Sequence, residues 1–342
     1  MKQIGMPLLR LLAVLYGGVV SVRNRYYDRP ANVRRAPLPV ISVGNITVGG
    51  TGKTPLVVWL AQCLLSSGRR PAIVSRGYGG TAGRGPVFVS HGGGPLCGPE
   101  VAGDEPYLMA STLAQVSVVV GSDRWAGASA AAAQGCDIAV LDDGFQHRGL
   151  ARDLDLVLID SNDPFGDLRL LPAGRMREPL AGLGRADLVL ITRSRADERH
   201  PDLERQIREH APRAPVLSAG HRTVGFFDAE GRGVEGPLRV VGFCGIGSPA
   251  KFRDDLRERA AEVVAFRVYR DHHVYTPDEL RSLRDLARSH GARLVTTDKD
   301  LARLRGRATP LAASELLSLR IEAVVHRPDP LLEALRQLEE GP

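Results

Sequence analysis

The sequence predicts an α/β fold with a doubly wound, mostly parallel sheet, followed by a second, smaller α/β domain. Three observations lead to this prediction. The apolar run Val40–Val43 enters a glycine-rich turn and then a stretch with helical character. Further short apolar runs alternate with helical stretches, which is the pattern of parallel strands joined by crossover helices. After residue 194 the pattern loosens until a strand restarts at Leu238, which places a domain boundary near residue 236.

The stretch from Val40 to Leu60 has the order strand, glycine-rich loop, Gly-Lys-Thr and helix. This order is typical of a phosphate-binding loop, so we expect a P-loop kinase-like sheet. A glycine-rich backbone lets N–H groups converge on a phosphate, at a helix start whose dipole favours anions. Lys53 would then neutralise the β- and γ-phosphates of ATP, and the Thr54 hydroxyl would hold Mg²⁺. The predicted nucleotide-binding residues are consecutive: Thr47, Val48, Gly49, Gly50, Thr51, Gly52, Lys53 and Thr54.

One position departs from the strict motif G-x-x-x-x-G-K-[ST], which has a glycine where this chain has Thr47. A glycine-rich turn that binds nothing is therefore the alternative interpretation. The strand before the loop and the helix after it favour a phosphate loop, because both are parts of the motif's structural context.

Composition narrows the class of partner. The chain has 342 residues, 43% of them hydrophobic and 25% charged, which is ordinary for a globular protein. A net charge of +6 and a pI of about 9.4 favour an anionic partner: nucleic acid, a phospholipid surface or a phosphorylated substrate. Aromatic residues are only 5%, and no basic stretch alternates with stacking rings, so we expect no nucleic-acid binding. The four cysteines are scattered without a C-x-x-C pair, which fits reduced thiols.

Residues 4–22 are almost wholly apolar, with one charge at Arg10. Their length is at the lower limit for crossing a bilayer. An arginine- and tyrosine-rich collar follows at residues 23–35, as expected at the cytoplasmic interface of a membrane. We therefore predict a membrane-associated helix that either spans the bilayer or lies on it. A cleaved signal peptide and a buried amphipathic helix are the alternatives, and no small-x-small site ends the run.

The predicted organisation has three parts. Residues 1–28 form the hydrophobic anchor helix and its basic collar. Residues 29–236 form the P-loop nucleotide-binding domain, and residues 237–342 form a smaller α/β domain that closes over the active site.

Carboxylates follow a second strand of the predicted sheet. The apolar strand Asp137–Leu141 runs directly into Asp142 and Asp143. An apolar strand that ends in carboxylates, several βα units after a phosphate loop, is typical of a Walker B element that holds Mg²⁺. We expect Asp142 to be this ligand, with Thr54.

Further charged residues stand at strand ends and helix starts. Asp104 and Glu105 open an apolar helix, where they either cap the helix or face the phosphate site. Arg76 follows a short strand, Arg124 begins a helix, and Arg177 lies in the loop L-P-A-G-R-M-R-E-P. We expect these arginines to meet the γ-phosphate or a substrate phosphate.

Eight motifs follow one another over residues 40–303: V-G-N-I-T-V-G-G-T-G-K-T-P, V-S-R-G-Y-G-G, G-D-E-P, D-D-G-F-Q-H-R-G-L-A-R-D, L-P-A-G-R-M-R-E-P, G-I-G-S-P, D-H-H and T-D-K-D. Together, and in this order, they resemble one family, the tetraacyldisaccharide 4′-kinases of lipid A assembly. The D-D-G-F-Q-H element is specific, because a generic phosphate loop does not require it. Thr47 is itself similar to the family, whereas Arg175 stands where proline is common.

This resemblance implies ATP-dependent phosphorylation of the 4′-hydroxyl of a tetraacyldisaccharide 1-phosphate, which gives lipid IVA. It implies work at the cytoplasmic face of the inner membrane, with Mg²⁺ and without an obligate protein partner. Asp104 would be the base and His272, from D-H-H, its partner in the second domain. Asp143, Gln146 and His147 would lie near the site without roles that the sequence separates.

Two other functions remain as alternatives. The first is a membrane-tethered NTPase switch or chaperone, because T-T-D-K-D is faintly similar to a guanine-reading element. The second is a soluble small-molecule kinase or ligase of the same fold. Nucleotide preference, and activity after deletion of residues 1–25, would separate these functions from a lipid kinase.

Overall fold

The computed structural model describes residues 5–260, 262–305 and 309–338. Strand β1 (Val40–Asn45) is the central strand of the larger lobe, and all six of its residues are buried. It pairs in parallel with β5 (Ile138–Asp142) on one side and with β6 (Leu154–Asp160) on the other. A continuous run of buried residues is what a central strand with helices on both faces requires.

The larger lobe continues this sheet in the order β8-β7-β6-β1-β5-β2-β4-β3. Its other strands are β2 (Pro71–Ser75), β3 (Val87–His91), β4 (Ser117–Val120), β7 (Leu188–Thr192) and β8 (Val216–Asp228). All neighbouring pairs in this order are parallel except β3 with β4 at the edge. Parallel strands end at the same edge, so the loops after β1, β2 and β5 lie together.

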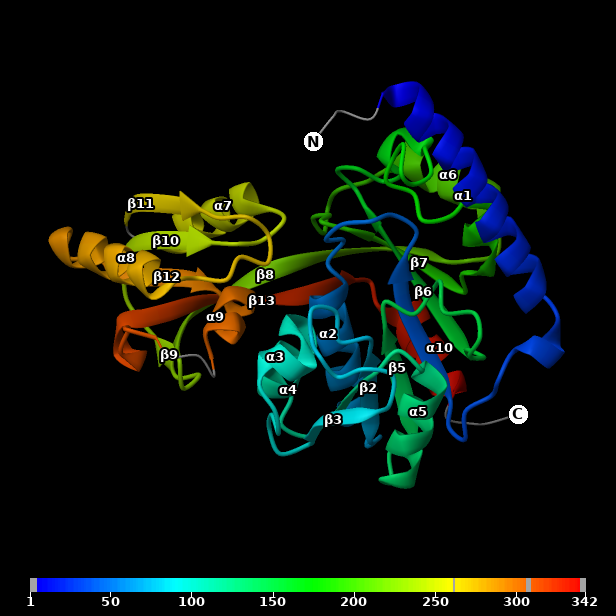
Figure 1. Cartoon of the computed structure of the whole chain (residues 1–342), viewed down its shortest axis with the longest axis horizontal. Coiled ribbons are helices and arrows are strands. Elements are labelled where there is room, and N and C mark those ends of the chain that lie inside the picture. Colours follow the sequence, from blue (N-terminus) through cyan, green and yellow to red (C-terminus); the bar gives the residue numbers. More distant parts are fainter. Residues whose placement is uncertain (1–4, 261, 306–308, 339–342) are drawn as a thin grey trace.

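Helices cover both faces of the larger lobe, which confirms the doubly wound fold (Figure 1). Ile41 and Val43 of β1 pack in a core with α2, α4 and α10, whereas Val40 packs with Ala128 of α5 on the opposite face. Alternate side chains of a strand point to opposite faces, so each face has its own helices. The helices of this lobe are α2 (Lys53–Ser66), α3 (Pro99–Ala102), α4 (Asp104–Thr112), α5 (Arg124–Ala133), α6 (Pro201–His210) and α10 (Asp329–Gln337).

The smaller lobe is a second α/β unit, as predicted. Its strands β11 (Glu262–Val268), β10 (Arg239–Cys244), β12 (Arg293–Thr297) and β13 (Leu316–His326) follow one another in parallel. Helix α7 (Pro249–Arg259) packs on one face, and α8 (Pro277–Ser289) and α9 (Asp298–Leu304) pack on the other. The short β9 (Gly233–Val234) pairs with β8.

Short 3-10 helices occur in both lobes, at Pro30–Asn32, Gly166–Leu168, Leu180–Arg185 and Ala313–Glu315.

Two long strands join the lobes, and the sequence did not predict them. β8 leaves the larger lobe and pairs with β13 in antiparallel fashion, so one sheet passes through both lobes (Figure 1). β8 mixes apolar, glycine and charged residues and is mostly half-buried, so it lacks a clear period of two. The chain returns along β13, and Leu331 and Leu335 of α10 pack into the core of the larger lobe. The division at residue 236 stays a prediction.

Helix α1 (Met6–Tyr27) lies along the outside of the larger lobe (Figure 1). Ala13 and Val20 are its buried residues, whereas most of its large apolar side chains are exposed. By length and composition it is able to cross a membrane. A long apolar face left open to solvent is unusual for a core helix, so the buried-helix alternative does not fit.

Candidate active site

The glycine-rich loop lies between the carboxyl end of β1 and the first turn of α2. Gly49 and Gly52 have φ angles of +122° and +81°, which side chains with a Cβ rarely adopt. Lys53 opens α2, and its Nζ donates to Asn45 Oδ1 at 3.1 Å and lies 3.4 Å from Asp143 Oδ1. The structure therefore brings the loop's lysine to the edge where β1 and β5 end.

Asp142 is buried at the end of β5, where one carboxylate oxygen accepts a hydrogen bond from Ser75 Oγ at 2.9 Å. Its other oxygen, Oδ1, has no hydrogen-bond partner among the described residues. Burial foremost, and then the charge of Glu105, raise the pKa of Asp142 to about 6 in spite of Lys53. A buried carboxylate with a free oxygen is poorly satisfied by the protein alone.

Asp143 is held differently from its neighbour. Its φ of +55° turns the side chain toward Lys53 and Arg177, and Arg177 Nη1 donates to it at 2.8 Å. Burial raises the pKa of Asp143, but Lys53 and Arg177 outweigh burial and hold it below its usual value. Arg177 also donates to Gln146, which in turn donates to Asn45 O and Glu178 Oε1. These residues form one hydrogen-bonded network under the loop.

The donor set around the loop fits Mg²⁺. Asp142 Oδ1 and Thr51 Oγ1 are buried polar atoms without partners in the part of the chain that the structure describes. The described residues contain no group of three or more His, Cys, Asp or Glu side chains that could hold a metal ion. Mg²⁺ beside a nucleotide needs no such cluster, because it takes one or two carboxylates, a hydroxyl, phosphate oxygens and water. Asp142 and Thr54 supply ligands of these types.

A second network joins the two lobes at Asp104, the first residue of α4. His272 Nδ1 lies 3.0 Å from Asp104 Oδ2, and Arg303 Nε donates to the same oxygen at 2.5 Å. His272 has a φ of +58° and follows β11, whereas Arg303 lies on α9. Burial raises the pKa of Asp104, but His272 and Arg303 together hold it below its usual value. Asp104 is therefore an ionised carboxylate whose partners belong to the other lobe.

The remaining candidate residues surround these networks. Glu105 accepts from Lys299 Nζ at 3.1 Å, and the same nitrogen lies 3.5 Å from His272 Nε2. Arg76 is exposed after β2, whereas Arg124 is buried at the start of α5. Burial lowers the pKa of Arg124 to about 10. Burial, followed by the charges of Arg124, Arg152 and Arg76, lowers the pKa of His147 to about 4, so its ring is neutral at pH 7.

Sequence reasoning missed residues that the structure places in the second network. Lys299 and Arg303 lie one helical turn apart on α9 and contact the neighbouring carboxylates Glu105 and Asp104. Asp300, fully buried, accepts from Gly245 N, Tyr275, Thr297 and Arg303 and so supports the arginine. The charged end of T-T-D-K-D and the four-residue spacing of Lys299 and Arg303 could have indicated a charged helix face. They do not identify the residues that this face contacts.

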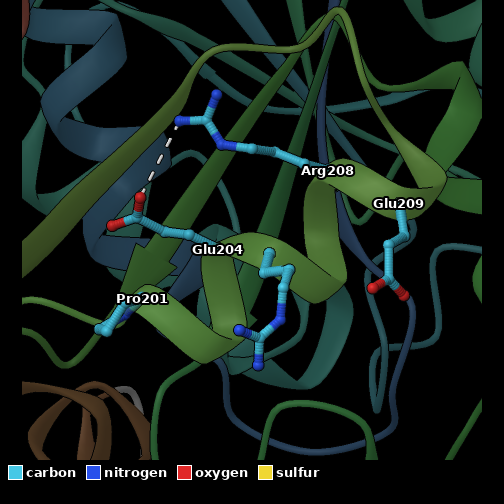
Figure 2. Close-up of a pocket in the computed structure, with 5 residues that line it drawn as sticks. Pro201, Glu204, Arg208 and Glu209 are labelled. Atoms are coloured by element: carbon cyan, nitrogen blue, oxygen red, sulfur yellow. Dashed lines mark ion pairs between the residues drawn. The ribbon is translucent and has the colours of Figure 1, made fainter.

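A shallow hollow elsewhere on the surface is not this site. It lies along α6 and is lined by Pro201, Glu204, Arg205, Arg208 and Glu209 (Figure 2). None of these residues belongs to the networks around Lys53 or Asp104. Arg208 and Glu204 point toward one another across one turn, 3.9 Å apart, as in an ordinary surface ion pair.

The chain is similar to known proteins over nearly its whole length. The model of the family described as tetraacyldisaccharide-1-P 4′-kinase matches residues 6–340. The chain belongs to the tetraacyldisaccharide 4′-kinase family. A tetraacyldisaccharide 4′-kinase of Anaeromyxobacter sp. (strain Fw109-5) is 42% identical over 341 residues, 96% of this chain and 90% of the relative. Another, of Chlorobium luteolum, is 40% identical over 324 residues, 90% of this chain and 89% of the relative.

A solved member of the tetraacyldisaccharide 4′-kinase family supports the fold. A crystal structure of LpxK from Aquifex aeolicus in complex with ATP has a TM-score of 0.77 and 32% identity. The match covers 96% of this chain and 97% of that one. Membership makes the chain a kinase that phosphorylates the lipid A precursor at its 4′ position. The NTPase-switch and small-molecule-kinase alternatives are therefore wrong.

Proposed function

We propose that the chain transfers the γ-phosphoryl group of ATP to the 4′-hydroxyl of tetraacyldisaccharide 1-phosphate, which gives lipid IVA, with Asp104 as the base. The observation that carries this assignment is the contact of His272 Nδ1 with Asp104 Oδ2 at 3.0 Å. It joins a proton-accepting carboxylate of the phosphate-loop lobe to a histidine of the other lobe. An acceptor hydroxyl between the lobes would meet this carboxylate.

The reaction needs a base, charge neutralisation and alignment. Asp104 takes the proton of the 4′-hydroxyl as its oxygen bonds to the γ-phosphorus. The bond from that phosphorus to the β,γ-bridging oxygen breaks, and ADP carries away the electron pair. His272 orients Asp104 and shares its proton. Lys53, whose ammonium is already fixed by Asn45 and Asp143, offsets negative charge on the β- and γ-phosphates.

Mg²⁺ would be held by Asp142 and Thr54, and it would supply charge neutralisation of the phosphate oxygens. Asp143 keeps Lys53 and Arg177 in place, because it pairs with both. Arg76 and Arg124 remain the candidates for the γ-phosphate or the substrate's 1-phosphate. Of the two, Arg76 has the exposed side chain that a lipid-borne phosphate would reach.

We propose that the enzyme acts at the membrane surface. Tyr16 Oη donates to Arg177 O at 2.8 Å, and Arg148 Nη1 donates to Asn24 O at 2.8 Å, so α1 is attached to the lobe near its middle and its end. A spanning α1 would place Tyr16, and with it Arg177, in hydrocarbon, which is costly. We infer that α1 lies on the bilayer with its exposed apolar face inserted. ATP and the collar of arginines favour the cytoplasmic face of the inner membrane.

The test is transfer of labelled γ-phosphate from ATP to tetraacyldisaccharide 1-phosphate in mixed micelles. Lys53→Ala should lower turnover by at least about a hundredfold, on the scale of losing one preorganised charge. Lys251→Ala is the matched control, because that lysine pairs with Asp255 on its own helix, α7. Near-normal turnover in Lys53→Ala would contradict the assignment of the phosphate loop.

A further inference from the structure

Two arginines donate hydrogen bonds to carbonyl groups of the phosphate loop. Arg175 Nη2 donates to Val48 O at 2.8 Å, and Arg193 Nη2 donates to Gly50 O at 2.6 Å. Each arginine is paired with an aspartate that ends or follows β6: Arg175 with Asp163, and Arg193 with Asp160 at 3.3 Å. Neither arginine belongs to the loop's own motif.

These contacts affect the direction of the backbone N–H groups that would bind phosphate. Gly50 O and the N–H of Thr51 belong to one planar peptide unit and point in opposite directions. A guanidinium that fixes this carbonyl therefore also fixes the direction of the N–H, on the opposite side of the peptide unit. Glycine peptides turn easily, so an unheld loop would lose this alignment part of the time. Arg193 thus orients the loop before nucleotide arrives.

Arg193 has a second partner, in the smaller lobe. The same Nη2 donates to Ser248 Oγ at 3.1 Å, and Ser248 is the N-cap residue of α7. Arg193 itself follows β7 with a φ of +60°, a strained conformation for a residue with a Cβ. One side chain therefore contacts the phosphate loop, the end of β6 and the first turn of a helix in the other lobe.

We propose that Arg193 is a positioning residue that couples the phosphate loop to the smaller lobe. Its guanidinium sets the direction of the Gly50–Thr51 peptide, and its bond to Ser248 links that peptide to the lobe that carries His272. Nucleotide affinity depends on the first contact, and turnover depends on both. This inference rests on the proposed ATP-binding role of the loop.

The experiment measures ATP affinity by direct titration and turnover at saturating ATP, for Arg193→Ala, Arg193→Lys, Ser248→Ala and the double variant Arg193→Ala/Ser248→Ala. Arg193→Ala should weaken ATP binding about tenfold, the factor for losing one charged hydrogen bond, and should also lower kcat. Ser248→Ala should change ATP affinity less than about twofold while lowering kcat, since it removes only the link between lobes. Arg193→Lys should recover part of the affinity, because a lysine reaches one partner. Arg195→Ala, at an exposed neighbouring arginine, is the control.

The coupling appears as non-additivity. In the Ser248→Ala background, Arg193→Ala should lower kcat by a smaller factor than in the wild type. Unchanged ATP affinity in both Arg193 variants would overturn the orienting role, and fully additive losses of kcat would overturn the coupling. Full turnover in Lys53→Ala would instead contradict the phosphate-loop assignment, so the two failures are distinguishable.

Discussion

His272 and Arg303 of the smaller lobe meet a single oxygen of Asp104, with His272 Nδ1 at 3.0 Å and Arg303 Nε at 2.5 Å. Asp104 stands on α4 of the larger lobe, so the proposed base is completed by residues from across the boundary between lobes. Arg303 is itself held by buried Asp300. The position of the smaller lobe therefore determines the electrostatic surroundings of the base.

The first prediction concerns the pairing of Asp104 with His272. Asp104→Ala should remove most of the turnover while ATP still binds, because the carboxylate acts on the acceptor hydroxyl. His272→Ala should lower turnover less, since the histidine orients the base. Added to Asp104→Ala, His272→Ala should have little further effect, which a double-mutant cycle on kcat measures. Additive losses would mean independent roles, and a large loss of ATP affinity in Asp104→Ala would make that residue a nucleotide or metal ligand.

The second prediction concerns pH. Arg303 lowers the pKa of Asp104, so Arg303→Met should raise it. A base works only when ionised, and a higher pKa leaves more of it protonated at a given acidic pH. The acid limb of kcat/KM should therefore move to higher pH in Arg303→Met and return toward the wild type in Arg303→Lys. Arg305→Met is the control; an unchanged acid limb in Arg303→Met would contradict the role of the ion pair.

The third prediction concerns Mg²⁺. Asp142→Asn removes the charge of the buried carboxylate but keeps its shape. Turnover should fall at least about a hundredfold, as for one lost electrostatic contact to the transferring group. The Mg²⁺ concentration for half-maximal activity should rise in parallel. Asp137→Asn, at the residue that precedes β5, is the matched control. An unchanged Mg²⁺ requirement in Asp142→Asn would assign the metal to other residues.

The fourth prediction concerns α1. Val14 and Leu15 are 72% and 59% exposed. Burial of either side chain in the bilayer would stabilise the membrane-bound state by about 1.5–3 kcal/mol. Val14→Asp with Leu15→Asp should lower co-sedimentation with anionic phospholipid vesicles by more than about tenfold. Val268→Asp, at an exposed valine of the smaller lobe, should leave it unchanged. Equal binding by all three proteins would contradict a membrane role for this face.

The fifth prediction concerns stability. The pKa of His147 is about 4 in the folded chain, against an ordinary value of 6.5. Between pH 4 and pH 6.5 the unfolded chain therefore binds more protons at this residue than the folded chain does. This difference lowers the free energy of unfolding as the pH falls from 6.5 to 4. His147→Asn lacks this proton, so its free energy of unfolding should fall less over the same range. Urea unfolding at pH 7 and pH 5 measures the difference; parallel losses in both proteins would contradict it.

Local patterns predicted much of the larger lobe. The strand, loop and helix around Lys53 and the strand before Asp142 could be predicted from residues that are close together in the sequence. Short apolar runs and glycine positions are enough to indicate such elements. They correctly predicted a mostly parallel sheet. β8 and β13 escaped prediction because their burial comes from pairing with each other, and their sequences lack strict alternation.

By itself, the sequence determined which chemical groups are available: a phosphate loop, a pair of strand-end carboxylates and an apolar N-terminal helix. The tertiary structure decided which of these groups meet. Asp104 and Arg303 are 199 positions apart, and Arg193 and Gly50 are 143 apart. No local propensity encodes such contacts. They exist because one sheet continues through both lobes along β8 and β13, and its geometry brings α9 against α4 and the end of β7 against the phosphate loop.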